Sequence, residues 1–361
     1  MRIVVIGAGA IGGFVGGKLA AVGQEVTLVD RPHLAEVVQE KGLRVVEPGY
    51  EITVRPAVTT ELAQAFAGST PADLVLLCVK TFDTQAAVDS LRPFASQFRF
   101  ILTLQNGLGN EEILAQAFAA DKVISGTITH PVVVPEPGVV RSEKAKGGIG
   151  LAPVGKQDIT SWVELFNTTG IVTRGYDDYR ALKWSKLLLN IIGNASSAIL
   201  GMNTARVFND RKLVALEVAQ LREAVAVMDA LKVTPVALPG YPVPLLMMAL
   251  RYLPTFALGY IMRPLVVSGR AEKLPSLLIE LNRNSGKSEV DELNGAVMRV
   301  GQSLNVPTPV NFTLTTTLNL LTQMPALREA WKENGERLAI VARAAKVPPL
   351  PSAEAMPQDE T

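Results

Sequence analysis

A lysine and two asparagines recur at intervals of four residues in the stretch 183–194. Lys186, Asn190 and Asn194 would share one face of a helix over two turns. The residues between them are mostly leucine and isoleucine, and asparagine is a poor helix former on a solvated face. The pattern therefore favours a polar stripe facing a cleft, where a partly desolvated lysine has a lowered pKa and donates a proton near neutral pH. A solvated lysine beside capping asparagines is the alternative.

A second group of polar residues lies in the stretch 286–295. Ser288 and Asp291 are three residues apart, directly before apolar residues at helical spacing, which is typical of a capping box with aspartate in the acidic position. A carboxylate of Glu289 or Asp291 would also be stabilised by the helix dipole. The pattern alone is structural and assigns neither carboxylate to a site.

The first thirty residues indicate a nucleotide cofactor. Gly7 permits a tight turn, Gly9 lets the backbone approach a pyrophosphate, and Gly12 lets the following helix pack on the sheet. The N–H groups at the start of that helix would point at the phosphates. The order of elements supports a dinucleotide site of the Rossmann type, and a tight turn without a ligand is the alternative. The parts are a strand over 2–6, the turn Gly7-x-Gly9-x-x-Gly12, an apolar helix to Val22 and a strand over 25–29.

Composition narrows the class of protein. The chain has 361 residues, of which 48% are hydrophobic and 19% charged, so it is long enough for two well-packed domains. A formal net charge of +1 argues against nucleic acid and anionic membrane as partners. The single Cys78 cannot form an intramolecular disulfide, and two histidines are too few for a metal site. Because the chain starts directly with a strand, we expect no secretory signal and a cytoplasmic location.

The first half of the chain alternates apolar runs with helical stretches, which predicts a parallel α/β sheet. Continuous apolar runs are typical of strands covered on both faces. Since ligands bind beyond the carboxyl ends of such strands, the loops that follow should face the cofactor. The strands are expected at 74–79, 100–104 and 123–127, with loops from Lys80, Gln105 and Ile128; a hairpin is expected over 131–152, a helix over 158–167 and a strand over 171–174.

From residue 176 the apolar period becomes helical. The sequence therefore predicts a Rossmann domain over 1–175, a helical substrate and dimerisation domain over 176–345, and a disordered tail over 346–361. The segment 233–267 is unusually apolar, but its prolines and Arg251 leave no spanning helix. It is interpreted as two short buried helices in this domain or at a dimer interface, or as an apolar wall of the substrate pocket. Helices are expected at 176–200, 210–231, 290–304 and 311–322.

Five motifs in a fixed order resemble the ketopantoate reductase (2-dehydropantoate 2-reductase) family over nearly the whole chain. The resemblance implies a doubly wound Rossmann sheet followed by an all-α domain of the 6-phosphogluconate dehydrogenase type. It also implies NADPH-dependent reduction of 2-dehydropantoate to (R)-pantoate, a step of pantothenate and coenzyme A synthesis. The motifs are Gly7-x-Gly9-x-x-Gly12, Val79-Lys80-Thr, Leu104-Gln-Asn106-Gly-Leu-Gly109, Trp184-x-Lys186-x-x-x-Asn190-x-x-x-Asn194 and Ser288-Glu289-Val-Asp291-x-Leu-Asn-Gly295.

The resemblance also implies roles for individual residues. Lys186 would protonate the ketone oxygen, and Glu289 would orient the substrate and this lysine. Lys80 would lie on the cofactor side, and Arg31 would read the 2′-phosphate. The substrate set is Asn106, Asn190, Asn194 and, with a slightly different spacing, Ser276; the cofactor set is Gly7, Ala8, Gly9, Ala10, Ile11, Gly12, Arg31, Lys80, Asn106 and Glu289.

The sequence leaves alternatives for the specificity toward cofactor and substrate. Asp30 precedes Arg31; a carboxylate at this spacing favours a ribose 2′-hydroxyl, whereas the arginine favours a 2′-phosphate. NADPH is the expected cofactor, with NADH left open. The expected partner is a small 2-oxo acid, and a homodimer is left open. The rival functions are a reductase of a bulkier or more apolar 2-oxo acid and a non-catalytic NADP(H)-binding sensor.

Overall fold

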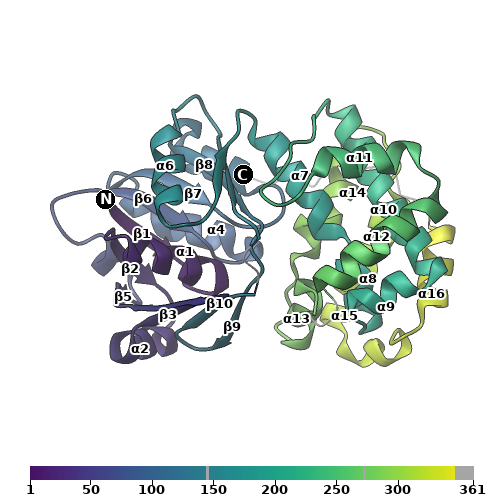
Figure 1. Cartoon of the computed structure of the whole chain (residues 1–361), viewed down its shortest axis with the longest axis horizontal. Coiled ribbons are helices and arrows are strands. Elements are labelled where there is room, and N and C mark those ends of the chain that lie inside the picture. Colours follow the sequence, from purple (N-terminus) through teal and green to yellow (C-terminus); the bar gives the residue numbers. More distant parts are fainter. Residues whose placement is uncertain (144–145, 271–273, 346–361) are drawn as a thin grey trace, which may run out of the picture. The chain divides into compact units, whose positions relative to one another are not determined.

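The computed structural model describes residues 1–143, 146–270 and 274–345 (Figure 1). The chain forms two compact units. Unit 1 contains Met1–Lys186 and the short segment Pro235–Val243, and unit 2 contains Leu187–Thr234 and the described residues from Pro244 onward. The tail predicted over 346–361 lies outside the described residues.

Unit 1 is built around an eight-stranded sheet in the order β12-β11-β8-β7-β6-β1-β2-β5. The six strands from β8 to β5 are parallel, and β11 runs antiparallel to β8. The chain proceeds outward from β1 in one direction and then from β6 in the other, so the strand order reverses between these two strands. This confirms the predicted doubly wound sheet. The strands are β1 (Arg2–Ile6), β2 (Glu25–Val29), β5 (Ala57–Thr59), β6 (Ala72–Leu77), β7 (Phe98–Thr103), β8 (Val123–Ile128), β11 (Ile149–Pro153) and β12 (Thr173–Gly175).

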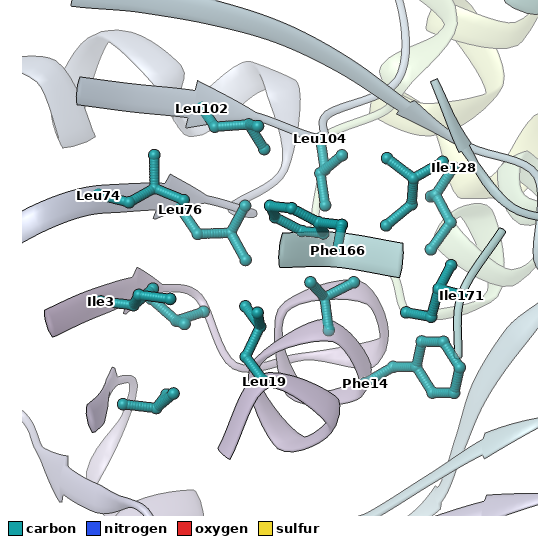
Figure 2. Packing of buried hydrophobic residues seen from close by; sticks show 14 of the residues in the cluster. Ile3, Phe14, Leu19, Leu74, Leu76, Leu102, Leu104, Ile128, Phe166 and Ile171 are labelled. Atoms are coloured by element: carbon teal, nitrogen blue, oxygen red, sulfur yellow. The ribbon is translucent and has the colours of Figure 1, made fainter. Parts of the chain in front are cut away.

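Alternate residues of the apolar strands enter two separate cores. Ile3 and Val5 of β1 pack with Phe14 and Phe166 on one face, in a cluster that Figure 2 shows from close by. Val4 and its neighbours pack on the other face against α3, α4 and α5. Because helices cover both faces, the strands are apolar without alternation. The helices of this unit are α1 (Ala10–Ala21), α2 (Pro32–Lys41), α3 (Leu62–Ala65), α4 (Thr84–Leu91), α5 (Asn110–Phe118) and α6 (Thr160–Thr168), with short 3₁₀ turns η1 (Thr81–Asp83), η2 (Arg92–Phe94) and η3 (Ala120–Lys122).

A second, four-stranded sheet in the order β4-β3-β10-β9 lies in the same unit. The predicted hairpin over 131–152 is correct only in its first part, because β9 and β10 pair antiparallel whereas β11 joins the main sheet. The sequence does not show that β10 and β11 belong to different sheets, because an apolar strand fits either sheet equally well. The strands are β3 (Leu43–Glu47), β4 (Tyr50–Val54), β9 (Val132–Glu136) and β10 (Val139–Ser142).

The second half of the chain is helical, as predicted, but the helix expected over 176–200 is two helices. Gly193 separates them with a left-handed backbone (φ 64°), a conformation that glycine adopts readily. Helix α7 carries the chain from unit 1 into unit 2. The helices are α7 (Tyr179–Ile191), α8 (Asn194–Leu200), α9 (Thr204–Asn209), α10 (Arg211–Ala230), α11 (Val243–Tyr252), α12 (Thr255–Arg270), α13 (Ser276–Asn282), α14 (Asn294–Ser303), α15 (Pro309–Gln323) and α16 (Gly335–Ala344), with 3₁₀ turns η4 (Glu289–Glu292) and η5 (Pro325–Ala330).

The apolar segment 233–267 contains the two predicted helices, α11 and α12, but they are not fully buried. Tyr252, Phe256 and Tyr260 are 77%, 78% and 86% exposed. Helical periodicity finds such apolar faces but cannot say whether the rest of the chain covers them. Among the described residues, no helix combines the length and apolar character that crossing a membrane requires.

Candidate active site

The glycine-rich turn after β1 leaves room for a phosphate group. Gly7 has a positive φ of 87°, and a Cβ on Gly12 would lie 2.0 Å from the Gly7 carbonyl oxygen, so the backbone packs too closely there for any side chain. A Cβ on Gly9 would meet nothing within 4 Å. No side chain caps the first turn of α1, so its N–H groups face this open space. The turn fits the pyrophosphate of a dinucleotide.

Asp30 holds the same turn from the end of β2. Its Oδ2 accepts a hydrogen bond from the Ala8 N–H at 2.5 Å, and its Oδ1 accepts one from the Arg31 N–H at 2.7 Å. The carboxylate thus has a structural task that its spacing in the sequence does not reveal. Arg31 is exposed at the start of α2, and no ion pair of its guanidinium occurs among the described residues.

The loops that carry Lys80 and Asn106 are joined at the carboxyl edge of the sheet. They follow β6 and β7, which are adjacent and parallel. The Thr81 hydroxyl donates a hydrogen bond to the Asn106 carbonyl oxygen at 2.9 Å. The Gln105 amide donates to the carbonyl oxygen of Val79 at 2.9 Å. The two loops therefore form one connected surface beside the glycine-rich turn.

Beneath these loops lies a buried cation that the sequence analysis missed. Lys183 Nζ is 3.0 Å from Glu111 Oε1, and the two side chains are 3% and 1% exposed. The same Nζ donates a hydrogen bond of 2.7 Å to the Gln105 carbonyl oxygen. A lysine flanked by buried Leu182 and Trp184 was the available signal, because lysine is almost never fully buried without a partner.

Helix α7 carries Lys186 and Asn190 one turn apart, as predicted, whereas Asn194 does not continue their stripe. It is the first residue of α8. Its side chain donates 3.1 Å hydrogen bonds to the Asn190 carbonyl oxygen and the Ser276 hydroxyl, and accepts one from the Leu277 N–H. The structure therefore brings Ser276 to Asn194 although the two are distant in the sequence.

The break between α7 and α8 is stabilised from α10. Glu217, fully buried, accepts a hydrogen bond of 2.7 Å from the Gly193 N–H. Gln220 donates one of 3.1 Å to the Ile191 carbonyl oxygen. These contacts satisfy backbone groups that the left-handed residue removes from the helix ladder. Two residues of α10 thus fix the direction of α8, which begins at Asn194, relative to α7.

Glu289 lies in η4, and the capping box predicted there is not formed. The Ser288 hydroxyl accepts a hydrogen bond from the Val290 N–H, but Asp291 accepts one from the Asn319 amide at 2.8 Å and does not return to the turn. Glu289 is 3% exposed, and its N–H donates to Glu280 Oε2 at 3.0 Å. Glu280, like Glu217, is a buried carboxylate of unit 2 that the sequence analysis did not single out.

Two shifted pKa values belong to the surroundings of these motifs. Desolvation, reinforced by neighbouring Asp291, raises the pKa of the Glu292 carboxyl. Desolvation also raises the pKa of the Cys78 thiol, next to β6. A thiol with a raised pKa remains protonated and is a poor nucleophile. Cys78 is therefore suited to packing beside Gly12 and not to nucleophilic chemistry.

Comparison with known families covers both units. The family "Ketopantoate reductase PanE/ApbA" matches residues 3–155, and its C-terminal counterpart matches residues 178–322. The chain belongs to the ketopantoate reductase family. Membership indicates an oxidoreductase that uses a nicotinamide cofactor. The first match contains the glycine-rich turn, Lys80 and Asn106, and the second contains Lys186, Asn190, Asn194, Ser276 and Glu289.

Individual relatives agree with this membership. A 2-dehydropantoate 2-reductase from Pyrococcus horikoshii is 29% identical over 319 residues, which are 87% of this chain and 95% of that protein. The crystal structure of a ketopantoate reductase from Ralstonia eutropha is 27% identical, with a TM-score of 0.75 over 89% of this chain and 98% of that one. D-mandelate dehydrogenase, solved with NADH and anilino(oxo)acetate, shares the fold at 20% identity, with a TM-score of 0.73 over 92% and 99% of the chains.

Proposed function

We propose that the protein reduces 2-dehydropantoate to (R)-pantoate with NADPH, as a step of pantothenate and coenzyme A synthesis. The observation that carries the proposal is that family matches in both units contain a full set of motif residues. The open space at Gly9 supports a bound dinucleotide. Lys186 and Asn190 lie one turn apart on α7. Their polar side chains support the proposal of a small substrate that is rich in oxygen atoms.

The proposed chemistry divides between cofactor and protein. NADPH supplies the hydride for the keto carbon. Lys186 donates a proton to the ketone oxygen, so that the C=O bond becomes CH–OH with one hydride and one proton added. Glu289, whose counterpart in the family orients the substrate, takes that role here. Asn190 and Asn194 offer amide groups that bind the substrate by hydrogen bonds and carry no charge themselves.

The substrate proposal is tested by a panel of 2-oxo acids with either cofactor. We expect the highest kcat/KM for 2-dehydropantoate with NADPH, lower values for pyruvate and 2-oxoisovalerate, and the lowest for phenylglyoxylate. A site built for hydroxyl groups leaves its polar groups unpaired when an analogue lacks them. A preference for phenylglyoxylate would favour the bulkier-substrate function instead. Tight NADPH binding without turnover on any acid would favour the sensor.

The cofactor proposal depends on Arg31. Asp30 is engaged with its own turn, and the exposed guanidinium of Arg31 offers the positive charge and hydrogen-bond donors that a 2′-phosphate requires. Arg31→Ala should raise the KM for NADPH about 10- to 100-fold, since hydrogen bonds to charged groups contribute about 1.5–3 kcal/mol, and should leave the KM for NADH nearly unchanged.

A matched control for this variant is Arg99→Ala. Arg99 is also an exposed arginine of unit 1, but it lies near the start of β7 and pairs with Asp73. We expect its substitution to change neither KM. Equal changes for NADPH and NADH in Arg31→Ala would show that Arg31 does not read the 2′-phosphate.

A further inference from the structure

The ion pair of Lys183 and Glu111 has no part in the proposed proton or hydride transfer, yet both of its side chains are almost completely buried. Their side chains are 3% and 1% exposed. Removing two charges from water is costly, and apolar side chains of similar volume are often at least as stabilising. Stability alone therefore does not account for a charged pair at this position, and its contacts suggest another role.

The hydrogen bond from Lys183 reaches a residue that organises both cofactor-side loops. It ends on the backbone carbonyl oxygen of Gln105 at 2.7 Å. The Gln105 side chain donates to the carbonyl oxygen of Val79 at 2.9 Å and to the Thr84 hydroxyl at 2.8 Å. Gln105 is thus fixed at once from the loop after β6, from α4 and from α7. The next residue in the chain is Asn106.

The partner Glu111 is equally well fixed. It lies in the first turn of α5, where the helix dipole stabilises a carboxylate. Its Oε1 also accepts a hydrogen bond of 2.8 Å from the Ser125 hydroxyl, on the fully buried part of β8. The ammonium of Lys183 is therefore held between the start of α5 and the loop after β7, and both are attached to the central sheet.

Lys183 precedes Lys186 by three residues on α7, which is about 4.5 Å along the helix axis. A slip of the helix by one turn would move Lys186 by about 5.4 Å. A misplacement of about 1 Å at a reacting group can cost about 100-fold in rate. Lys183 lies about one turn from Lys186 and is hydrogen-bonded to Gln105, the residue before Asn106. It is therefore placed where it controls the position of Lys186 relative to Asn106.

We propose that Lys183 is a positioning residue: its ion pair with Glu111 and its hydrogen bond to Gln105 hold Lys186 and Asn106 in register for the reaction. The inference rests on the proposed function for the roles of Lys186 and Asn106. The anchoring itself is a property of unit 1 and does not depend on the substrate.

The test compares Lys183→Met, Glu111→Gln and the double variant. Each single variant leaves an unpaired buried charge and should lower the Tm. Each should also lower kcat about tenfold or more, with a larger deuterium isotope effect on hydride transfer and an unchanged KM for NADPH. The double variant, which has no unpaired charge, should regain Tm but keep the low kcat. All rates are measured well below the lowest Tm.

Hydrogen–deuterium exchange supplies a measurement that needs no substrate. In Lys183→Met, exchange should become faster in residues 104–110 and 179–186. The matched control is Lys18→Met, because Lys18 and Glu47 form another largely buried ion pair of unit 1, with side chains 10% and 20% exposed. This control should lower the Tm without changing kcat or exchange in those two segments.

Two results would overturn the proposal. One is unchanged exchange in 104–110 and 179–186 of Lys183→Met, and the other is full recovery of kcat together with Tm in the double variant. If the parent enzyme reduces no 2-oxo acid, the proposed function fails, and the exchange measurement still decides whether Lys183 anchors these segments.

Discussion

Replacing Lys186 by methionine is expected to lower kcat about 100- to 10,000-fold, the usual contribution of a general acid. Methionine keeps much of the length of the side chain and removes the proton donor. The dissociation constant of NADPH, measured by quenching of protein fluorescence, should change little because Lys186 acts on the substrate ketone. Turnover by Lys186→Met at the parent rate would exclude this lysine as the acid.

Two further variants separate proton donation from charge. Lys186→Arg retains a cation that binds a ketone oxygen but does not give up its proton near neutral pH. We expect it to recover substrate binding, seen as KM, without recovering kcat. Lys212→Met serves as the control, since Lys212 pairs with Glu336 on the surface and both side chains are more than half exposed. It should leave kcat and KM unchanged.

The sheet could be predicted from the sequence because its signals are local. A strand buried on both faces is apolar at every position, and the turn after β1 requires glycines at fixed spacing. These elements predicted a parallel sheet, and the resemblance to the family implied its doubly wound order. The family motifs then indicated which loops carry Lys80 and Asn106, and the structure joins those loops through Thr81 and Gln105.

The misjudged parts depend on partners that are distant in the sequence. The spacing of Lys186, Asn190 and Asn194 suits one continuous helix, but Gly193 adopts a left-handed conformation that Glu217 of α10 stabilises. A periodicity argument sees residues four apart and cannot see a carboxylate from another helix. The same limit explains why Ser288 and Asp291 suggested a capping box.

The buried ion pair was missed for a different reason. Lysine and glutamate are common on surfaces, so Glu111 gives no signal by itself, and the apolar neighbours of Lys183 do not reveal its partner. Only the fold places them 3.0 Å apart. Asp30 is the opposite case, a residue that the sequence did single out. Its spacing suggested a contact with ribose, and the structure shows that it also accepts hydrogen bonds from the backbone of Ala8 and Arg31.

The second large effect is expected at Gly12. A Cβ there would lie 2.0 Å from the Gly7 carbonyl oxygen and 3.0 Å from Cys78 Cβ. The first contact is with backbone and no rotamer relieves it, so Gly12→Ala must move the start of α1 away from β1. Overpacking costs about 1–3 kcal/mol when side chains yield, and we expect at least the upper value here. Thermal unfolding should show a Tm lowered by about 5 °C or more, together with loss of NADPH binding.

Gly9→Ala is the matched variant that separates stability from binding. Its Cβ meets no atom of the protein within 4 Å, and its backbone is extended (φ −67°, ψ −152°) and not left-handed. The Tm should therefore stay at the parent value. The methyl group would occupy the space that the pyrophosphate needs, so NADPH should bind at least about tenfold more weakly, a loss of about 1.4 kcal/mol. Unchanged NADPH affinity in Gly9→Ala would mean that the phosphates do not lie against this turn, whereas a fall in Tm equal to that of Gly12→Ala would mean that Gly9 serves the fold.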